Sequence, residues 1–244
     1  MDWYEKWFGQ DYLDVYTHRS EKEAEEFINT LEKILSLQPE QKLLDLCCGT
    51  GRYSLALAQR GYAVTGLDLS SRLIDFAKKR SKELGVKVDF IVRDMRNIPF
   101  SGYFDGILNM FTSFGYFEAD SENEKVIMAA SNALKKDGWF VLDYLNRDNI
   151  IQNFQEFDEQ KKENVLIQQK RKLNFDTNRI EKVITITRND STKEYFESVK
   201  MYSHGDLEQM YRANNIRLTH KFGNYDGTPL DNVSPRAILI GRKM

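Results

Sequence analysis

The sequence Lys42-Leu-Leu-Asp-Leu-Cys-Cys-Gly-Thr-Gly-Arg52 carries the strongest local signal in this chain. An apolar run around one acid, Asp45, breaks at a Gly-x-Gly turn and passes into a helical pattern from Tyr53. This order predicts a strand, a tight loop and a helix. Gly49 and Gly51 lack a Cβ, so a ligand can lie against bare peptide there. The unpaired N–H groups that open the helix then point at that ligand.

Two classes of nucleotide-like ligand use such a loop. A dinucleotide fingerprint has a third glycine that lets helix and strand pack closely, and this chain has Ser54 at that position. The next predicted strand ends in Asp68, where a carboxylate can accept both hydroxyls of an adenosine ribose. Asp68 alone fits either ligand. A nicotinamide-dependent oxidoreductase is therefore one possible interpretation of this loop and strand.

Three ordered motifs resemble those of the class I S-adenosylmethionine-dependent methyltransferases. They are LDLCCGTGR, VTGLDLS and VDFIVRDM, the last with an acid where strand three should end. The resemblance implies that the glycine loop backs the methionine moiety, that Asp68 holds the ribose and that Asp94 and Met95 bracket the adenine. It implies that Asp45 orders the loop. The cofactor-binding residues implied in this way are Tyr12, Tyr16, Arg19, Asp45, Cys47, Gly49, Gly51, Asp68, Leu69, Asp94, Met95, Asn109 and Phe111.

The rest of the chain predicts an α/β fold. The capping box Ser20-Glu-Lys-Glu23 predicts a helix to about Leu37, and Ser70 is the expected N-cap of another to Leu84. Helices of this length alternate with strands, which predicts a parallel sheet with helices on both faces. Further segments expected here are strands 88–92, 104–109 and 139–144 and a helix 121–135. Gly49, Asp68, Asp94, Asn109 and Tyr144 are expected to converge beyond the carboxyl ends of the strands.

The alternation stops after residue 144. Period-two patterns predict three antiparallel strands at 164–175, 179–188 and 194–202, followed by a helix near 205–214 and two closing strands, 216–222 and 236–241. The closing pair resembles the antiparallel hairpin at one sheet edge of Rossmann-like methyltransferases. We therefore expect a seven-stranded, mostly parallel sheet in a methyltransferase domain of residues 1–147 and 204–244, with an N-terminal helical cap at 1–37. Residues 148–203 form an inserted β-meander, a lid or substrate platform.

The composition limits the possible partners. The net charge of the 244 residues is -2, so no global field attracts polyanions. Enzymes that methylate nucleic-acid amino groups resemble one another in an Asn/Asp-Pro-Pro-aromatic signature, and Asn109-Met-Phe lacks both prolines. No apolar run approaches the ~20 residues of a membrane span. Cys47 and Cys48 are adjacent and without metal-ligand spacing, which indicates a reduced, cytoplasmic protein. A small-molecule acceptor is the expected partner.

Candidates for acid–base catalysis are few. They are His18, Tyr116 and His204, although a lone histidine is more often a surface or packing residue; His220, on a predicted edge strand, is expected to be structural. Asp143 and Asn146, together with Asn109, resemble the oxygen ligands of metal-dependent catechol methyltransferases. Without an acid at the end of strand four, no metal is expected.

Two further segments have alternative interpretations. The N-terminal aromatic segment 12–19 is either a helix at the domain edge or, by the resemblance, a cover in which Tyr12, Tyr16 and Arg19 close the methionine end of the cofactor. The basic pieces Lys161-Lys162 and 170–172 are either a solvated strand face or a site that recognises an acidic substrate. The prediction for the whole chain is a methyltransferase acting at N or O of a small molecule. A non-catalytic cofactor-binding protein is a further alternative.

Overall fold

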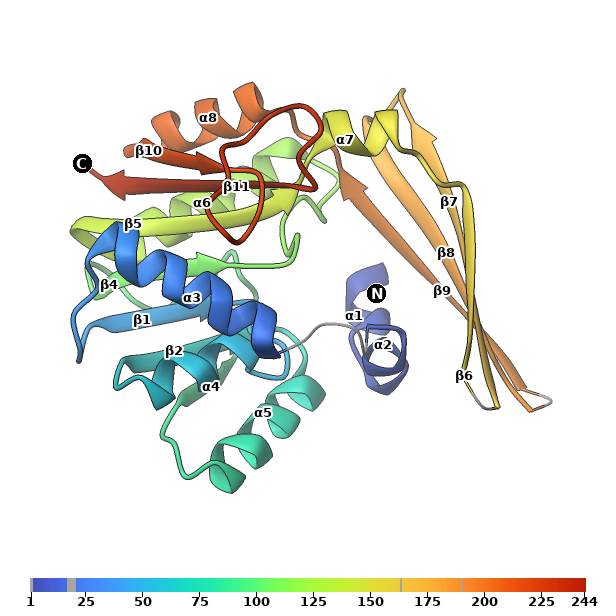
Figure 1. Cartoon of the computed structure of the whole chain (residues 1–244), viewed down its shortest axis with the longest axis horizontal. Helices are drawn as coiled ribbons and strands as arrows, with labels where there is room; N and C mark the ends of the chain where they lie inside the picture. Colours follow the sequence, from blue (N-terminus) through green and yellow to red (C-terminus); the bar gives the residue numbers. More distant parts are fainter. Residues whose placement is uncertain (1, 17–20, 163, 190) are drawn as a thin grey trace.

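Two separate β-sheets organise the structure. The computed structural model describes residues 2–16, 21–162, 164–189 and 191–244. Seven strands form one sheet in the order β10-β11-β5-β4-β1-β2-β3, and four form the other in the order β6-β7-β8-β9. Figure 1 shows the smaller sheet standing apart from the larger one, with the short N-terminal helices between them.

The seven-stranded sheet is parallel except at one edge. Strands β1, β2, β3, β4 and β5 pair in parallel, while β11 runs antiparallel to both β5 and β10. This confirms the predicted Rossmann-like fold with an antiparallel closing hairpin. The strands are β1 Lys42–Leu46, β2 Ala63–Asp68, β3 Asp89–Val92, β4 Phe104–Asn109, β5 Leu134–Leu145, β10 Ile216–Phe222 and β11 Arg236–Lys243.

Helices cover both faces of this sheet because successive strand residues point to opposite sides. Leu43 packs with Phe27 and Leu31 on one face, whereas its neighbour Leu44 packs with Ile127 on the other. The two cores are therefore separated by the sheet itself. The helices are α1 Trp3–Trp7, α2 Gln10–Val15, α3 Glu21–Leu35, α4 Arg52–Gln59, α5 Ser71–Glu83, α6 Asp120–Ala133, α7 Arg147–Gln152 and α8 His204–Ala213. None of the described helices has both the length and the apolar character needed to cross a membrane.

The helix ends follow the sequence signals in part. Ser70 caps α5, because its hydroxyl accepts a hydrogen bond from the Leu73 N–H at 3.2 Å. Ser20, the expected start of α3, lies outside the described residues. Asp137 and Gly138, expected to precede the fifth strand, lie within it: β5 already begins at Leu134, and its register against β4 shifts near this point. The turn signal therefore produces a bulge rather than a break.

The inserted sheet has one strand more than the pattern predicts. Its strands are β6 Phe157–Lys162, β7 Val165–Asn174, β8 Arg179–Arg188 and β9 Ser191–Lys200. The sequence FDEQKK of β6 has almost no apolar alternation, so its pairing with β7 depends on backbone hydrogen bonds at a solvated edge. The short helix α7, also absent from the prediction, connects β5 to this sheet.

The N-terminal helices pack on the inserted sheet. Trp7 and Val15 share a small apolar core with Ile167, Ile184 and Ile186 of β7 and β8. Ion pairs reinforce this contact, since Arg188 pairs with Asp11 and Asp14, and Lys193 also reaches Asp11 at 3.0 Å. Residues 3–15 and the four-stranded sheet thus form one wall that faces the carboxyl edge of the larger sheet (Figure 1).

Candidate active site

Three sequence motifs meet at the carboxyl edge of the seven-stranded sheet. Gly49 follows β1, Asp68 ends β2 and Asp94 lies just beyond β3, and all three line one cleft. The Asp68 carboxylate accepts hydrogen bonds from the N–H groups of Gly49 and Ser70, both at 2.8 Å. The carboxylate therefore ties the glycine loop to the start of α5 and keeps free lone pairs for a ligand.

This first cleft combines carboxylates with apolar walls. Burial raises the pKa of Asp68. Although burial also opposes ionisation of Asp94, its ion pair with Arg96 at 2.6 Å lowers the pKa of that carboxyl. The cleft is narrow, with a volume of about 60 Å³. Its lining residues are Tyr4, Phe8, Tyr12, Cys47, Gly49, Asp68, Leu69, Leu73, Asp94, Met95, Ser113, Tyr116 and Phe117.

A second cleft of about 170 Å³ continues from the first. The two share Tyr12, Cys47, Gly49 and Ser113, so the glycine loop forms part of both walls. The second cleft carries charges of both signs, from Glu21, Asp45, Arg52 and Arg80. Tyr16, Tyr53 and Phe111 complete its aromatic side.

The two clefts differ in the chemistry of their walls. The first offers carboxylates for ribose hydroxyls and apolar surfaces, including Met95 and Leu69, for a flat base. The second offers cations and anions side by side, as the zwitterionic amino-acid end requires. The first cleft, at about 60 Å³, is smaller than a nucleoside, so binding of one there would require walls that include Phe8, Tyr12 and Tyr116 to move apart.

Asp45 holds the start of α4 beneath the glycine loop. Its Oδ2 accepts hydrogen bonds from the Ser54 N–H at 3.0 Å and the Ser54 hydroxyl at 2.6 Å. The dinucleotide fingerprint has a glycine at the position of Ser54. In this chain the Ser54 side chain instead binds Asp45 and joins the start of α4 to β1. Burial raises the pKa of Asp45 to about 6, against the ordinary 3.8.

This pKa predicts a pH-dependent contribution to stability. The folded state binds the Asp45 proton more tightly than the unfolded chain, so the contribution is present below pH 3.8 and lost as pH rises through about 6. We expect the unfolding free energy of the natural protein, relative to Asp45→Asn, to fall by about 3 kcal/mol across this window. Denaturant unfolding of both proteins at several pH values measures it. A difference that stays constant with pH would contradict the assignment.

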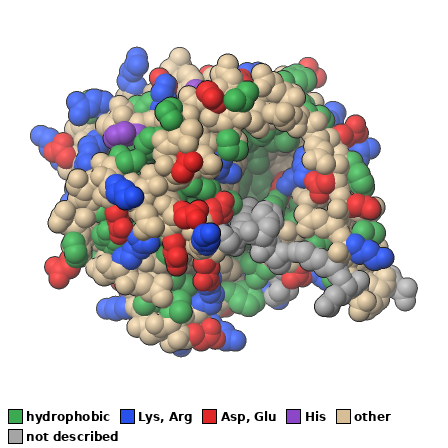
Figure 2. Space-filling model, in the orientation of Figure 1, with side chains coloured by type: hydrophobic (Ala, Val, Ile, Leu, Met, Phe, Trp, Pro, Cys, Tyr) green, Lys and Arg blue, Asp and Glu red, His purple; other side chains and the backbone are tan. Residues whose placement is uncertain are grey.

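A third and larger cavity adjoins the clefts. It has a volume of about 450 Å³ and lies between the N-terminal helices, α7 and the inserted sheet. Figure 2 shows this region as a deep hollow with hydrophobic walls. Phe8, Tyr12 and Tyr116 line both this cavity and the first cleft, so a molecule in the cavity lies directly beside the cofactor clefts. We call it the acceptor cavity.

Glu197 and Lys182 form a buried ion pair in the wall of the acceptor cavity, at 2.6 Å. The Glu197 carboxylate also accepts hydrogen bonds from the Trp7 indole and the Tyr16 hydroxyl, the latter at 2.8 Å. Burial opposes ionisation of Glu197, but Lys182 and these donors together lower its pKa. The group is therefore an ionised anchor that joins the N-terminal helices to β9, rather than a general base.

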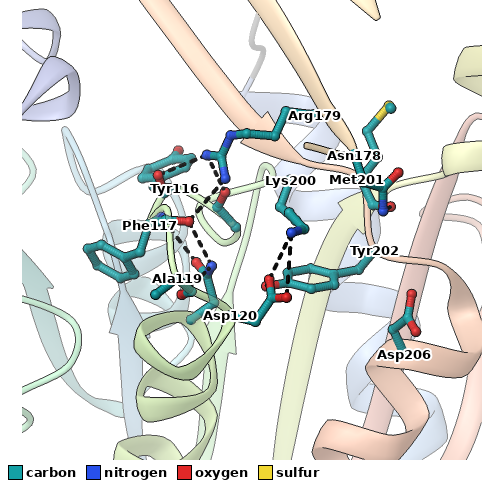
Figure 3. Close-up of polar contacts among 12 residues, drawn as sticks. Tyr116, Phe117, Ala119, Asp120, Asn178, Arg179, Lys200, Met201, Tyr202 and Asp206 are labelled. Atoms are coloured by element: carbon teal, nitrogen blue, oxygen red, sulfur yellow. Dashed lines mark hydrogen bonds and ion pairs between the residues drawn. The ribbon is translucent and has the colours of Figure 1, made fainter. Parts of the chain in front are cut away.

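Arg179, at the start of β8, connects the inserted sheet to the aromatic loop after β4. Its guanidinium donates to the carbonyls of Gly115, Tyr116 and Phe117 at 3.0 to 3.1 Å and to Ser198 Oγ at 2.7 Å. Figure 3 shows Arg179 beside Tyr116 and Phe117. Burial lowers the pKa of Arg179, which forms no ion pair with any described carboxylate. Because Tyr116 and Phe117 line the first cleft, Arg179 fixes one of its walls.

Asp143, at the end of β5, organises the neighbouring part of the same loop. Its carboxylate is fully buried, forms an ion pair with Arg236 and accepts hydrogen bonds from the Tyr225 hydroxyl at 2.6 Å and the Phe111 N–H at 2.9 Å. Phe111 and Thr112 have φ of 59° and 56°, which is strained for such side chains. The Asp143 cluster holds them in that conformation.

The structure does not place every sequence candidate at the clefts. Gly51 does not line them; at φ 80°, a Cβ there would lie 3.2 Å from both Ala77 and Phe90, so it allows close packing behind the loop. Asn109 is fully buried and donates to the Leu46 carbonyl, joining β4 to β1. His204 starts α8 and contacts Asn146 at 3.2 Å, away from the three cavities.

The remaining candidates have different outcomes. His18 and Arg19 lie outside the described residues. Tyr144 is buried, and its hydroxyl donates to the Lys200 carbonyl rather than facing a cleft. Asn146 donates to the carbonyls of Asp231 and Ser234. The sequence candidates that do line the clefts or the cavity are Tyr12, Tyr16, Asp45, Cys47, Gly49, Asp68, Leu69, Asp94, Met95, Phe111 and Tyr116.

Sequence reasoning missed several lining residues. Tyr4 and Phe8 line the first cleft. The sequence shows that the first eight residues are rich in aromatic side chains, but it does not show where they pack. Arg52 and Tyr53 directly follow the glycine loop, and this adjacency was a usable signal. Arg236 comes from the last strand, 127 positions after the end of β4, and no local pattern points to it.

Comparison with known proteins agrees with this geometry. Residues 43–138 match the family model described as a methyltransferase domain. The putative methyltransferase YqeM of Bacillus subtilis is 32% identical over 120 residues, which are 49% of this chain and 48% of that protein. The chain spans about half the length of the curated relatives it matches.

Solved structures extend the likeness to nearly the whole chain. An S-adenosylmethionine-dependent methyltransferase from Clostridium acetobutylicum superposes with a TM-score of 0.83 over 94% of both chains at 19% identity. CalS10 from Micromonospora echinaspora, an amino pentose methyltransferase solved with S-adenosylmethionine bound, has a TM-score of 0.69 over 96% of this chain and 97% of its own, also at 19% identity. Residues 43–138 are thus a methyltransferase domain, and the fold of the chain fits that of a class I S-adenosylmethionine-dependent methyltransferase.

Proposed function

We propose that this protein transfers the methyl group of S-adenosylmethionine to a nitrogen or oxygen atom of a small molecule bound in the acceptor cavity. The observation that carries the proposal is the shared wall of Phe8, Tyr12 and Tyr116 between that cavity and the first cleft. A volume of about 450 Å³ suits a small molecule, since ligand pockets commonly measure ~300 to 1,000 Å³. CalS10, which shares the fold, is an amino pentose methyltransferase.

The cofactor supplies an activated methyl group on a sulfonium. The protein's task is then to align the acceptor, exclude water and hold both molecules in place. Asp68 holds the ribose hydroxyls, Asp94 and Met95 bracket the adenine, and Arg52 faces the cofactor carboxylate. The aromatic rings of Tyr12 and Tyr116 stabilise positive charge near the sulfur, by ~0.5 to 2 kcal/mol for a ring face.

The inserted residues 148–203 act as the platform for the acceptor. Ile180, Lys182, Glu197 and Val199 all reach the acceptor cavity from β8 and β9. The N-terminal helices cover the same cavity, so we assign them to this platform as well as to the cofactor site.

Both cysteines are free thiols, and we place the protein in the reducing cytosol on that ground.

Calorimetric titration with S-adenosylhomocysteine and with NAD tests the cofactor assignment. We expect saturable binding of the first and none of the second. Methyl release from labelled S-adenosylmethionine over a library of small amines and alcohols then tests catalysis. Binding of S-adenosylhomocysteine without any methyl transfer would indicate a non-catalytic binding protein. Binding of NAD alone would indicate an oxidoreductase.

Asp68→Ala tests the ribose position. We expect its affinity for S-adenosylhomocysteine to fall by ~1 to 3 kcal/mol, because charged hydrogen bonds to the ribose are lost. Asp75→Ala, an exposed carboxylate on α5, is the matched control and should leave binding unchanged. Calorimetry of the three proteins gives the comparison. Equal affinities for all three would remove Asp68 from the site.

A further inference from the structure

The wall of the acceptor cavity is rich in cations. Its described lining contains Arg171, Lys182 and Arg236, against one carboxylate, Glu197. Lys182 and Glu197 neutralise each other at 2.6 Å. Two arginines therefore remain to set the electrostatic character of the cavity surface.

The carboxylates that pair with these arginines do not line the cavity. Asp143 pairs with Arg236 from a fully buried position, and Asp158 pairs with Arg171 from the edge strand β6. A molecule in the cavity thus contacts the guanidinium groups rather than the carboxylates that pair with them. The charged groups that line this side of the cavity are therefore positive.

Both arginines keep hydrogen-bond donors for a ligand. A guanidinium has five N–H groups. Arg236 uses Nε for Asp143 and Nη2 for the Thr112 hydroxyl at 3.1 Å, and no described residue accepts from its Nη1. Arg171 uses Nη2 for Asp158, while its Nη1 reaches only the Gln155 carbonyl, at 3.5 Å. Such planar groups match carboxylate and phosphate oxygens in pairs.

The Arg236 guanidinium is already held in place. Phe111 and Tyr225 present their rings to it at 5.4 and 5.6 Å, and Asp143 anchors its Nε. An anion that binds there pays little for ordering the side chain. Neither Arg236 nor Arg171 lines the cofactor clefts, so this anchor lies away from the methyl donor.

The basic run of β7 separates into two faces. Arg171 lines the cavity, whereas Lys170 and Lys172, on either side of it, are exposed. Of the two interpretations of this run, a solvated face applies to the lysines and substrate recognition to the arginine. Lys172 is thus a built-in control for Arg171.

We propose that the methyl acceptor carries an anionic group, a phosphate or a carboxylate, which Arg236 and Arg171 bind while the reacting atom lies beside Tyr12 and Tyr116. This inference rests on the proposed methyl transfer to a small molecule. It narrows the acceptor class to small amines or alcohols with a negatively charged end.

Binding of simple anions tests the anchor directly. Inorganic pyrophosphate and malonate are titrated into the complex with S-adenosylhomocysteine. We expect saturable binding of at least one, weakened about tenfold in Arg171→Gln and in Arg236→Lys, as expected for one lost charged hydrogen bond. Lys172→Gln should bind as the natural protein does. Tighter binding of pyrophosphate indicates a phosphate on the acceptor, and tighter binding of malonate indicates a carboxylate. The proposal is overturned if neither anion binds, or if both arginine variants bind the anions as the natural protein does.

Turnover provides the second readout. The acceptor library is arranged in matched pairs with and without a phosphate or carboxylate. We expect methylation of the charged members, with a KM raised about tenfold in Arg171→Gln and little change in kcat. Equal turnover of neutral members would overturn the anionic class while leaving the methyltransferase function intact. Failure of S-adenosylhomocysteine to bind the natural protein would instead count against the proposed function itself.

Discussion

Arg179→Met is expected to lower the free energy of unfolding by about 3 to 5 kcal/mol and to weaken S-adenosylhomocysteine binding. The stability loss follows because three loop carbonyls and Ser198 lose their buried donor, and each unsatisfied group costs ~1 to 3 kcal/mol. The binding loss follows because Tyr116 and Phe117 would no longer be fixed in the cleft wall. Denaturant unfolding and calorimetry measure the two effects.

Two further variants separate positioning from stability. Arg188→Met lies at the opposite end of the same strand, β8, and loses the ion pairs with Asp11 and Asp14 instead. It should destabilise the N-terminal contact but not the loop at residues 113–117. Arg179→Lys retains a charge with three donors and should recover part of the cofactor affinity. If Arg179→Met binds S-adenosylhomocysteine like the natural protein, Arg179 has no role at the cleft.

Asp143→Ala is expected to cost about 3 to 5 kcal/mol of unfolding free energy. Removing one partner of a buried ion pair leaves the other charge uncompensated, and here the Tyr225 hydroxyl also loses its acceptor. Thr112 and Phe111 would no longer be held at positive φ. The variant should therefore also lose methyl-transfer activity, because Phe111 lines both the acceptor cavity and the second cleft.

Glu208→Ala is the control for this experiment. Glu208 pairs with Lys221 at 2.8 Å on the surface, where both side chains are at least one-third exposed, and such pairs contribute ~1 kcal/mol or less. Asp143→Asn keeps an acceptor for the Tyr225 hydroxyl and should fall between the natural protein and the alanine variant. A loss in Asp143→Ala no larger than in Glu208→Ala would show that the cluster is not a source of stability.

The cofactor side of the site was predictable because it is local. Asp45, Gly49, Asp68 and Asp94 lie at the ends of consecutive strands, and parallel pairing brings those ends to one edge. The same logic failed for Asn109, whose side chain turns to the neighbouring strand instead of the ligand. A strand end predicts the edge of the sheet, but not the direction of each side chain.

The acceptor side was not predictable from the pattern. Arg171 and Glu197 come from the four-stranded sheet, whereas Arg236 starts β11 of the seven-stranded sheet. Only the packing of the two sheets and the N-terminal helices around one cavity makes these three residues neighbours. Long-range pairs such as Arg236 with Asp143 leave no trace in periodicity. β6 escaped for a different reason, since a polar edge strand has no apolar alternation to detect.

Tyr12 lines all three hollows, the two cofactor clefts and the acceptor cavity. Under the proposed function, one ring contacts both donor and acceptor, so exchange of the donor disturbs the place where the acceptor binds. We expect turnover to follow a compulsory order, in which S-adenosylmethionine binds first and S-adenosylhomocysteine leaves last. Product-inhibition kinetics test this order, because S-adenosylhomocysteine should then compete with S-adenosylmethionine and no other product–substrate pair should be competitive. In such an order the acceptor binds productively only after S-adenosylmethionine, and release of the spent donor must precede each new round.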